Sequence, residues 1–464
     1  MRRHPMSAVK QSKHELLTET PIPKLVWKLA VPTIISMLVT GIYNTADTYF
    51  VGQISTEATA AVGLVFTVMA IIQSLGFFCG HGSGNCLSRL LGAGKKEEAN
   101  EIAVTGFTLA LIIGTGLAIL GILFSDTLAD FIGATENSRQ HTVEYMQVIL
   151  LGAPFMVGQF VINNQLRFQG SAMIAMAGLM VGAVINVGLD PLLIFVFHMG
   201  VRGAAVATVC GQITSFITLL IGFSRGGEIR YHMKNIHLNL HNLLEIANGG
   251  MPSLFRQGLA ALSALLLNRF ANLYGGDPAI AGMSIVTRIL MLNVSVLIGF
   301  GQGYQPICSY NYGGGRYQRV REGFFYCLRW GTVMMTVAGA LCFLGAPEIV
   351  SWFRDDPKVI TIGIQALRWQ SAVLPLMATG VLTNMMLQSC GKGVIASITS
   401  SARNGIFFIP LILILPRLFG LTGVEMTQAW ADVFTFLLCV PVAWRELQKM
   451  NQHSLDRDCE RYSK

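Results

Sequence analysis

Residues 173–197 read MIAMAGLMVGAVINVGLDPLLIFVF, and this stretch decides the fold class. Asp190 is its single charged residue. A run of this length can cross the hydrocarbon core of a bilayer as a helix, which needs about 20 mostly apolar residues. Because lipid offers no partners to backbone groups, a helix is the form such a segment takes. The stretch therefore predicts a transmembrane helix with one carboxylate inside it.

Similar apolar stretches recur along all 464 residues. The composition agrees, because 52% of the residues are hydrophobic, 12% are charged and the mean hydropathy is +0.54, more apolar surface than a soluble core could bury. We therefore predict an all-α integral membrane protein with twelve transmembrane helices. The expected spans are 26–51, 59–86, 101–124, 141–166, 173–197, 204–224, 247–273, 279–307, 324–346, 362–388, 396–416 and 424–444.

The two halves of the sequence repeat each other at an offset of 221 residues. The matching segments are Gly80-His81-Gly82 with Gly301-Gln302-Gly303, Gly92 with Gly313, Pro154 with Pro375, and Gly170 with Gly391. Each repeat holds six predicted helices, an even number, so both begin on the same side of the membrane and are parallel repeats. We expect two pseudo-symmetric six-helix lobes that rock about a central cleft, a geometry typical of transporters.

The Lys and Arg residues follow alternate loops, on the side of both termini, which predicts that both ends are cytoplasmic. This pattern explains the net charge of +8 better than a nucleic-acid partner does. No signal peptide precedes the first span. The expected domains are an N-terminal tail (1–24), an N-lobe (25–224), a cytoplasmic linker (225–246), a C-lobe (247–444) and a C-terminal tail (445–464).

The sequence lacks the catalytic, metal-binding and nucleotide-binding motifs that we searched for. The nine Cys residues are scattered, without a CxxC pair or a His-Cys cluster. The sequence also lacks GxSxG, GxxxxGK[ST] and a His pair at helical spacing. We therefore expect no enzyme activity, no cofactor, no metal centre and no ATP hydrolysis by this chain.

Acidic residues inside spans are costly and usually functional, and we single out Asp47, Asp190 and Asp432. Asp47 and Asp190 are predicted at comparable depths near the outer ends of the first and fifth spans. Asn186 shares a helical face with Asp190, and Thr208 in the sixth span has a similar depth. These four side chains offer only oxygen ligands, which suit H⁺ or Na⁺ and no softer metal.

Structural interpretations remain open for several of these groups. Asp190 could cap a broken helix or pair with an Arg, and Asn186 and Thr208 could simply join helices. For Asp432 the structural reading is preferred, because Arg256, Arg288 and Arg403 are all expected in the C-lobe. We predict a structural ion pair between Asp432 and Arg288, because Arg288 is the deepest of the three arginines in the predicted spans.

Four segments carry a family resemblance. They are Tyr43-Asn44-Thr45-Ala46-Asp47-Thr48 with Val51-Gly52-Gln53, Ile185-Asn186-Val187-Gly188-Leu189-Asp190-Pro191, Gly301-Gln302-Gly303-Tyr304-Gln305-Pro306, and Tyr310-Asn311-Tyr312-Gly313. In these segments, over residues 25–445, the chain resembles the multidrug and toxic compound extrusion (MATE) family, and within it the bacterial MepA-like branch.

The resemblance implies a multidrug efflux antiporter that exports lipophilic, often cationic organic compounds in exchange for H⁺ or Na⁺. We expect a monomer in the bacterial cytoplasmic membrane. In relatives with a first-lobe cation site, an acid in helix 1, an Asn-x-x-x-Asp pair in helix 5 and a Thr in helix 6 hold the coupling cation. Asp47, Asn186, Asp190 and Thr208 occupy those places. Another branch uses acids in helices 7 and 10, and those spans contain no Asp or Glu here.

Polar residues in the fourth and tenth spans are the candidates for the substrate cleft: Gln159, Asn163, Asn164 and Asn384. An alternative function is a flippase or exporter of a lipid-linked or endogenous metabolite of the same superfamily. Arg256 and Arg288 keep that alternative open, since such a substrate would need cations in the cleft, whereas the first-lobe carboxylates argue against it.

Overall fold

The computed structural model describes residues 12–229, 231 and 239–462. Parts of the predicted N-terminal tail (1–11), linker (230 and 232–238) and C-terminal tail (463–464) lie outside the described residues. The described residues form helices and no strand, which confirms the predicted all-α class.

The N-terminal half contains a short helix followed by the helices of the first lobe. Their bounds are α1 Lys13–Glu19, α2 Ile22–Gly52, α3 Thr56–Gly92, α4 Lys96–Leu123, α5 Ser125–Phe131, α6 Glu136–Phe168, α7 Ala172–Pro191, the π-helix η1 Leu192–Val196, and α8 Gly200–Gly226. The helices of the C-terminal half are α9 Leu240–Gly313, α10 Tyr317–Leu344, α11 Ala346–Ser351, α12 Pro357–Ser389, α13 Gly393–Ser401, the π-helix η3 Ala402–Ile406, α14 Phe408–Phe419 and α15 Leu421–Tyr462.

Eleven helical segments in the described part of the chain are long and apolar enough to cross a membrane. One of them, α9, has 74 residues and is broken at Gly276, whose φ of 63° lies in the left-handed region that glycine tolerates. The break separates the predicted spans 247–273 and 279–307, so α9 supplies two crossings. The chain is a multi-pass membrane protein whose helices match the twelve predicted spans.

Glycines end helices at the same places in both halves. Gly94 and Gly315 have φ values of 80° and 69°, and Gly170 and Gly391 have φ values of 79° and 76°. The members of each pair stand 221 residues apart. A left-handed residue after the last turn closes a helix without a Cβ penalty only when it is glycine. The sequence repeat is therefore also a repeat of backbone turns.

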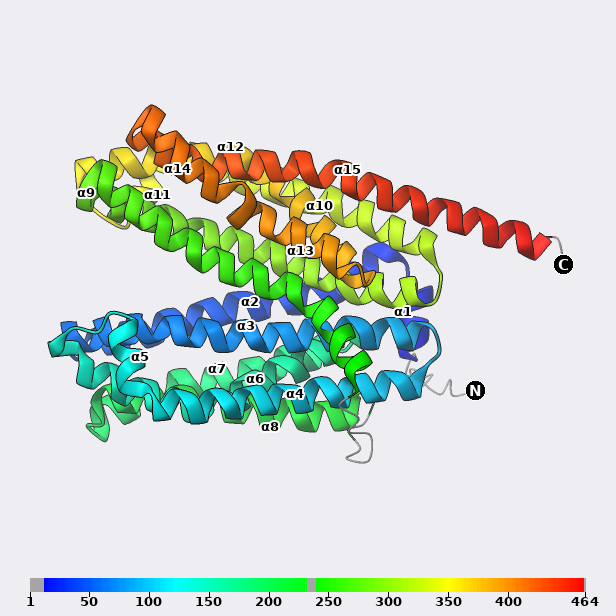
Figure 1. Cartoon of the computed structure of the whole chain (residues 1–464), viewed down its shortest axis with the longest axis horizontal. Coiled ribbons are helices and arrows are strands. Elements are labelled where there is room, and N and C mark those ends of the chain that lie inside the picture. The colour runs from blue at the N-terminus through cyan, green and yellow to red at the C-terminus, as the bar shows by residue number, and fades with distance from the viewer. Residues whose placement is uncertain (1–11, 230, 232–238, 463–464) are drawn as a thin grey trace, which may run out of the picture.

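The helices form two bundles that lie one above the other in Figure 1, with α2 to α8 in the N-lobe and α9 to α15 in the C-lobe. The bundles meet mainly through α3 and α9. The helix α1 and the C-terminal end of α15 lie at one end of the molecule, and α5 and α11 lie at the other. An even number of crossings in each lobe produces this arrangement.

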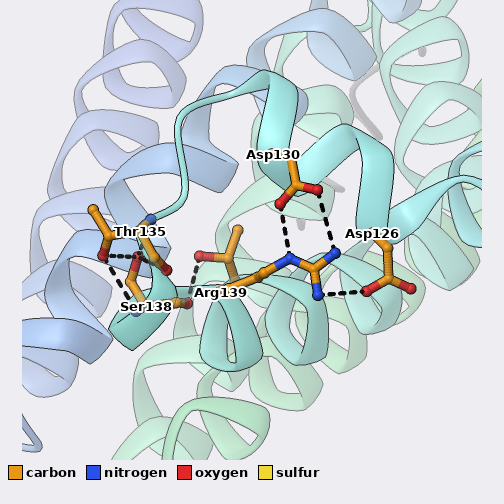
Figure 2. A network of polar contacts seen from close by, with 6 residues as sticks. Asp126, Asp130, Thr135, Ser138 and Arg139 are labelled. Carbon is orange, nitrogen blue, oxygen red and sulfur yellow. Dashed lines mark hydrogen bonds and ion pairs between the residues drawn. The ribbon is translucent and has the colours of Figure 1, made fainter.

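The end of the N-lobe that carries α5 is held by exposed ion pairs, shown in Figure 2. Arg139 Nε donates to Asp130 Oδ1 at 2.7 Å, and its Nη1 lies 3.3 Å from Asp126 Oδ1. The hydrogen bonds from Arg139 lower the pKa of the Asp130 carboxyl. Thr135 and Ser138 form a reciprocal cap that begins α6. The ion pairs thus join α5 to the first turn of α6, and the cap defines where α6 begins.

Candidate functional site

The helices α7 and α8 approach closely because each has a glycine where they cross, Gly182 on α7 and Gly211 on α8. A Cβ added at Gly211 would lie 2.7 Å from the carbonyl oxygen of Gly182, so a larger residue there would force the two helices apart. This approach places Asn186 Nδ2 3.3 Å from Thr208 Oγ1. Both side chains are buried. Two of the predicted ligands are thus joined across neighbouring helices.

Asp47 on α2 is buried and accepts a hydrogen bond from the Tyr145 hydroxyl on α6, with an oxygen-oxygen distance of 3.1 Å. Tyr145 also interacts with Thr208. Sequence reasoning missed Tyr145, because a single tyrosine near the start of a span carries no distinguishing pattern. It links the acid of the first predicted helix to the hydroxyl of the sixth.

Asp190 lies one turn beyond Asn186 on α7 and has no exposed surface. It is close enough to Asp47 for the two carboxyls to interact electrostatically. The fold therefore brings Asp47, Asn186, Asp190 and Thr208 together inside the N-lobe, although α2 is distant in the sequence from α7 and α8. Their role in cation binding remains a prediction.

Several buried oxygen atoms in this group have no hydrogen-bond donor among the residues that the structure describes. They are Asp47 Oδ1, Asn186 Oδ1 and both carboxyl oxygens of Asp190. Leaving a buried polar atom unpaired costs about 1–3 kcal/mol, more when it is charged. A proton or a cation with oxygen ligands would remove that cost, so the arrangement suits cation capture.

A small cavity of about 20 Å³ adjoins the group. Asn186 and Thr208 line it together with Gln159, and so do Gly182 and Gly211. A cavity of this size holds about one water-sized group. Within the described chain, no cluster of three or more His, Cys, Asp or Glu side chains could hold a metal ion.

In the C-lobe, Asp432 pairs with Arg403 and not with Arg288, so the predicted partner was wrong. Arg403 Nε lies 2.6 Å from Asp432 Oδ1. Arg403 sits on the π-helix η3 next to α15, whereas Arg288 is exposed on α9. The sequence analysis also missed Glu425, which is buried at 2% exposure near the start of α15.

The four cleft candidates occupy different environments. Asn163 donates to the Ala175 carbonyl at 2.9 Å, and Asn384 donates to the Ala396 carbonyl. Both asparagines thus join neighbouring helices, while Asn384 also lines a second cavity in the C-lobe. Asn164 accepts a hydrogen bond from Arg167. Gln159 faces the N-lobe cavity. Their contact with a substrate remains a prediction.

The lobes are joined by polar contacts in the half of the molecule that carries the termini. Arg167 of the N-lobe donates to Gln302 of the C-lobe. His81 Nδ1 lies 2.8 Å from Ser253 Oγ, and Arg89 Nη2 lies 3.1 Å from Glu245 Oε2. A Cβ at Gly92 or Gly313 would collide with the backbone of the other lobe. The lobes are therefore closed against each other at this end.

Comparisons with known proteins agree on one family. The sequence profile of the MatE family matches residues 32–192 and 252–414. The multidrug export protein MepA of Staphylococcus aureus is 30% identical over 431 residues, covering 92% of this chain and 93% of the relative. MepA of Staphylococcus haemolyticus is 28% identical over 428 residues, covering 92% and 94%. A structure described as the outward-facing conformation of a multidrug resistance MATE family transporter has a TM-score of 0.89 and 26% identity, covering 96% of this chain and 100% of that one.

Proposed function

Because this chain belongs to the MatE family, we propose that it is a secondary active exporter of lipophilic organic cations, driven by exchange for H⁺ or Na⁺. The names of its relatives, which are multidrug export proteins, support small organic molecules as substrates. We place it in a bacterial cytoplasmic membrane as a monomer with both termini inside. No nucleotide or cofactor takes part in this scheme.

One observation carries the proposal: Asp47, Asn186 and Asp190 bring four unpaired buried oxygen atoms to one place in the N-lobe. Each net positive charge that moves inward gains about 2.3 kcal/mol per 100 mV of membrane potential, equivalent to a tens-fold gradient. Exchange of two cations for one monovalent cationic drug would draw on that energy, whereas one-for-one exchange would draw on the concentration gradient of the coupling cation alone. Tyr145 and Thr208 complete the group as hydroxyl ligands. The drug and the coupling cation compete for the same carboxylates, so binding of one releases the other.

Rocking of the two lobes provides the alternating access in this proposal. The contacts of α3 and α6 with α9 close the end that we assign to the cytoplasm, among them those of Arg167 with Gln302 and of Arg89 with Glu245. Separating these pairs would open the cleft inward. Because each lobe holds its own bundle of helices, the movement leaves the coupling group intact.

The test is ethidium efflux from proteoliposomes under an imposed pH gradient, with and without Na⁺. We expect Asp190→Asn to abolish gradient-driven efflux. Asp126→Asn is the matched control, since Asp126 is exposed at the end of the N-lobe and lies outside the group. It should behave like the wild type.

Unchanged efflux in Asp190→Asn would overturn the assignment of the coupling group. Absence of gradient-driven efflux in the wild type, with ethidium or other lipophilic cations, would overturn the exporter itself. A requirement for Na⁺ at zero pH gradient would identify Na⁺ as the coupling ion.

A further inference from the structure

The C-lobe contains a cavity that is the repeat equivalent of the one in the N-lobe. Gly182, Ala183 and Gly211 line the N-lobe cavity, and the residues 221 positions further on, Arg403, Asn404 and Asp432, line the C-lobe cavity. Further matching pairs are Gln159 with Gly380, Phe160 with Val381, Leu179 with Ser400, and Ser215 with Phe436. The two cavities therefore occupy the same place in two copies of one bundle.

The charges around the two cavities are opposite. The N-lobe cavity adjoins Asp47 and Asp190 and has no Lys or Arg in its lining. In the C-lobe cavity, Arg403 and Asp432 neutralise each other at 2.6 Å. Arg256 also lines this cavity, and it forms no ion pair or hydrogen bond with any residue that the structure describes. One positive charge is thus left over in the C-lobe cavity.

Arg256 lies on the side of the cavity that faces the N-lobe. It is close enough to Arg167 and His81, both of the N-lobe, to interact electrostatically with them. Its neighbours across the interface are therefore the Arg167 guanidinium and the His81 ring. Neither carries the negative charge that would balance Arg256. A half-buried guanidinium without an anion is costly, because it has lost hydration without gaining a counter-charge.

The cavity is large enough to admit an anionic group. Its volume is about 60 Å³, and a water-sized group needs about 10–15 Å³ on the same measure. Asn384, Ser400 and Asn404 add polar atoms to an otherwise apolar wall. The planar guanidinium presents paired donors that match the two oxygens of a carboxylate. With one excess charge and room for only a few atoms, the cavity fits a single carboxylate.

We propose that the C-lobe cavity binds the carboxylate of zwitterionic organic substrates through Arg256, while their cationic group is read by the N-lobe acids. The inference rests on the proposed export function and specifies its substrate class. The protein then distinguishes a zwitterion from a plain cation by its C-lobe, and a plain cation binds without using Arg256.

The test uses a matched pair of fluorescent dyes, a rhodamine with a free carboxylate and its methyl ester, which is a plain cation. Binding to the purified full-length protein is measured by fluorescence polarisation, and efflux from proteoliposomes is measured in parallel. We expect Arg256→Gln to weaken binding of the free acid by about 10- to 100-fold, the worth of hydrogen bonds between charged groups. Binding of the ester should not change, and Arg256→Lys should restore part of the affinity for the acid.

Arg269→Gln is the control, since Arg269 is exposed on the same helix α9. Asp432→Asn is a second variant that leaves Arg403 without its partner, and we expect it to raise the affinity for the acid relative to the ester. The carboxylate site would be overturned if Arg256→Gln lost affinity for the acid and the ester equally. It would also be overturned if the wild-type protein bound the ester and not the acid. Either result would leave the exporter intact. Efflux of neither dye by the wild type would overturn the proposed function as well.

Discussion

The two lobes have cavities at equivalent positions of the repeat, but the residues that line them differ in size and charge. At the crossing of α7 and α8, Gly182 touches Gly211, and at the equivalent crossing in the C-lobe Arg403 pairs with Asp432. The glycine pair brings two helices close and leaves buried oxygens unpaired beside them. The ion pair instead fills the crossing with long side chains. The comparison teaches that a repeated backbone tolerates opposite charge patterns wherever each charge has a partner or a ligand.

What the two lobes keep in common is the backbone framework. Asn163 and Asn384 each donate to a carbonyl twelve residues further on, Ala175 and Ala396. The glycine turns at Gly94 and Gly315 also recur. These residues join or end helices. Both lobes have the same helical framework, so the same residue types recur at these positions. The residues that line the two cavities instead differ in charge, as the ligands that we propose for them do.

The largest expected effect comes from breaking the ion pair of the C-lobe. Arg403→Met would leave Asp432, which is 4% exposed in its side chain, as a buried charge without a cation. We expect a loss of about 3 kcal/mol in stability, measured by thermal unfolding in detergent. Replacing both residues, as Arg403→Met with Asp432→Leu, should recover most of that loss. If the single and double variants were equally stable, the unpaired charge of Asp432 would not be the cause of the loss in Arg403→Met.

A smaller effect is expected from filling the glycine crossing of the N-lobe. In Gly211→Ala the added Cβ would lie 2.7 Å from the Gly182 carbonyl oxygen and 2.9 Å from Asn186 Cβ. We expect α7 and α8 to separate, with a loss of about 1–3 kcal/mol in stability and weaker coupling-ion binding. Gly188→Ala, where a Cβ on α7 meets nothing within 4 Å, is the control and should be neutral. Similar melting curves for the two variants would contradict the close approach.

The smallest effect is expected at the exposed ends of the lobes. Arg139 holds Asp126 and Asp130 in the N-lobe, whereas Ser351 and Ile360 stand at the positions equivalent to Asp130 and Arg139 in the C-lobe. Because the pKa of Asp130 is lowered in the fold, its contribution is present at neutral pH and is lost as the pH falls through the folded pKa. We expect Arg139→Gln to lower the melting temperature slightly at pH 7 and not at all once Asp130 is protonated. A difference between wild type and variant that persists in acid would contradict the ion pair as its cause.

The sequence was sufficient for the number of helices and for the repeat, because apolar length and glycine turns are local properties. It was also sufficient to group Asp47, Asn186, Asp190 and Thr208, since depth along a helix follows from residue count. It was not sufficient for the partner of Asp432. Arg403 lies on the π-helix η3, whose wider turn rotates side chains away from the regular helical period, so depth alone pointed to Arg288. The hydrogen bond from Tyr145 likewise depends on packing between distant helices.

The contacts that close the lobes use few opposite charges. Apart from Arg89 with Glu245, the central bonds of Arg167 with Gln302 and of His81 with Ser253 join a cation or a ring to neutral groups. A hydrogen bond between neutral groups contributes about 0.5–1.5 kcal/mol net and one to a charged group about 1.5–3 kcal/mol, because water can replace either. In the rocking that we propose, parting the lobes exchanges these central bonds for bonds to water, so these bonds oppose opening only weakly. The proposed opening then requires the rupture of one ion pair among these contacts, that of Arg89 with Glu245.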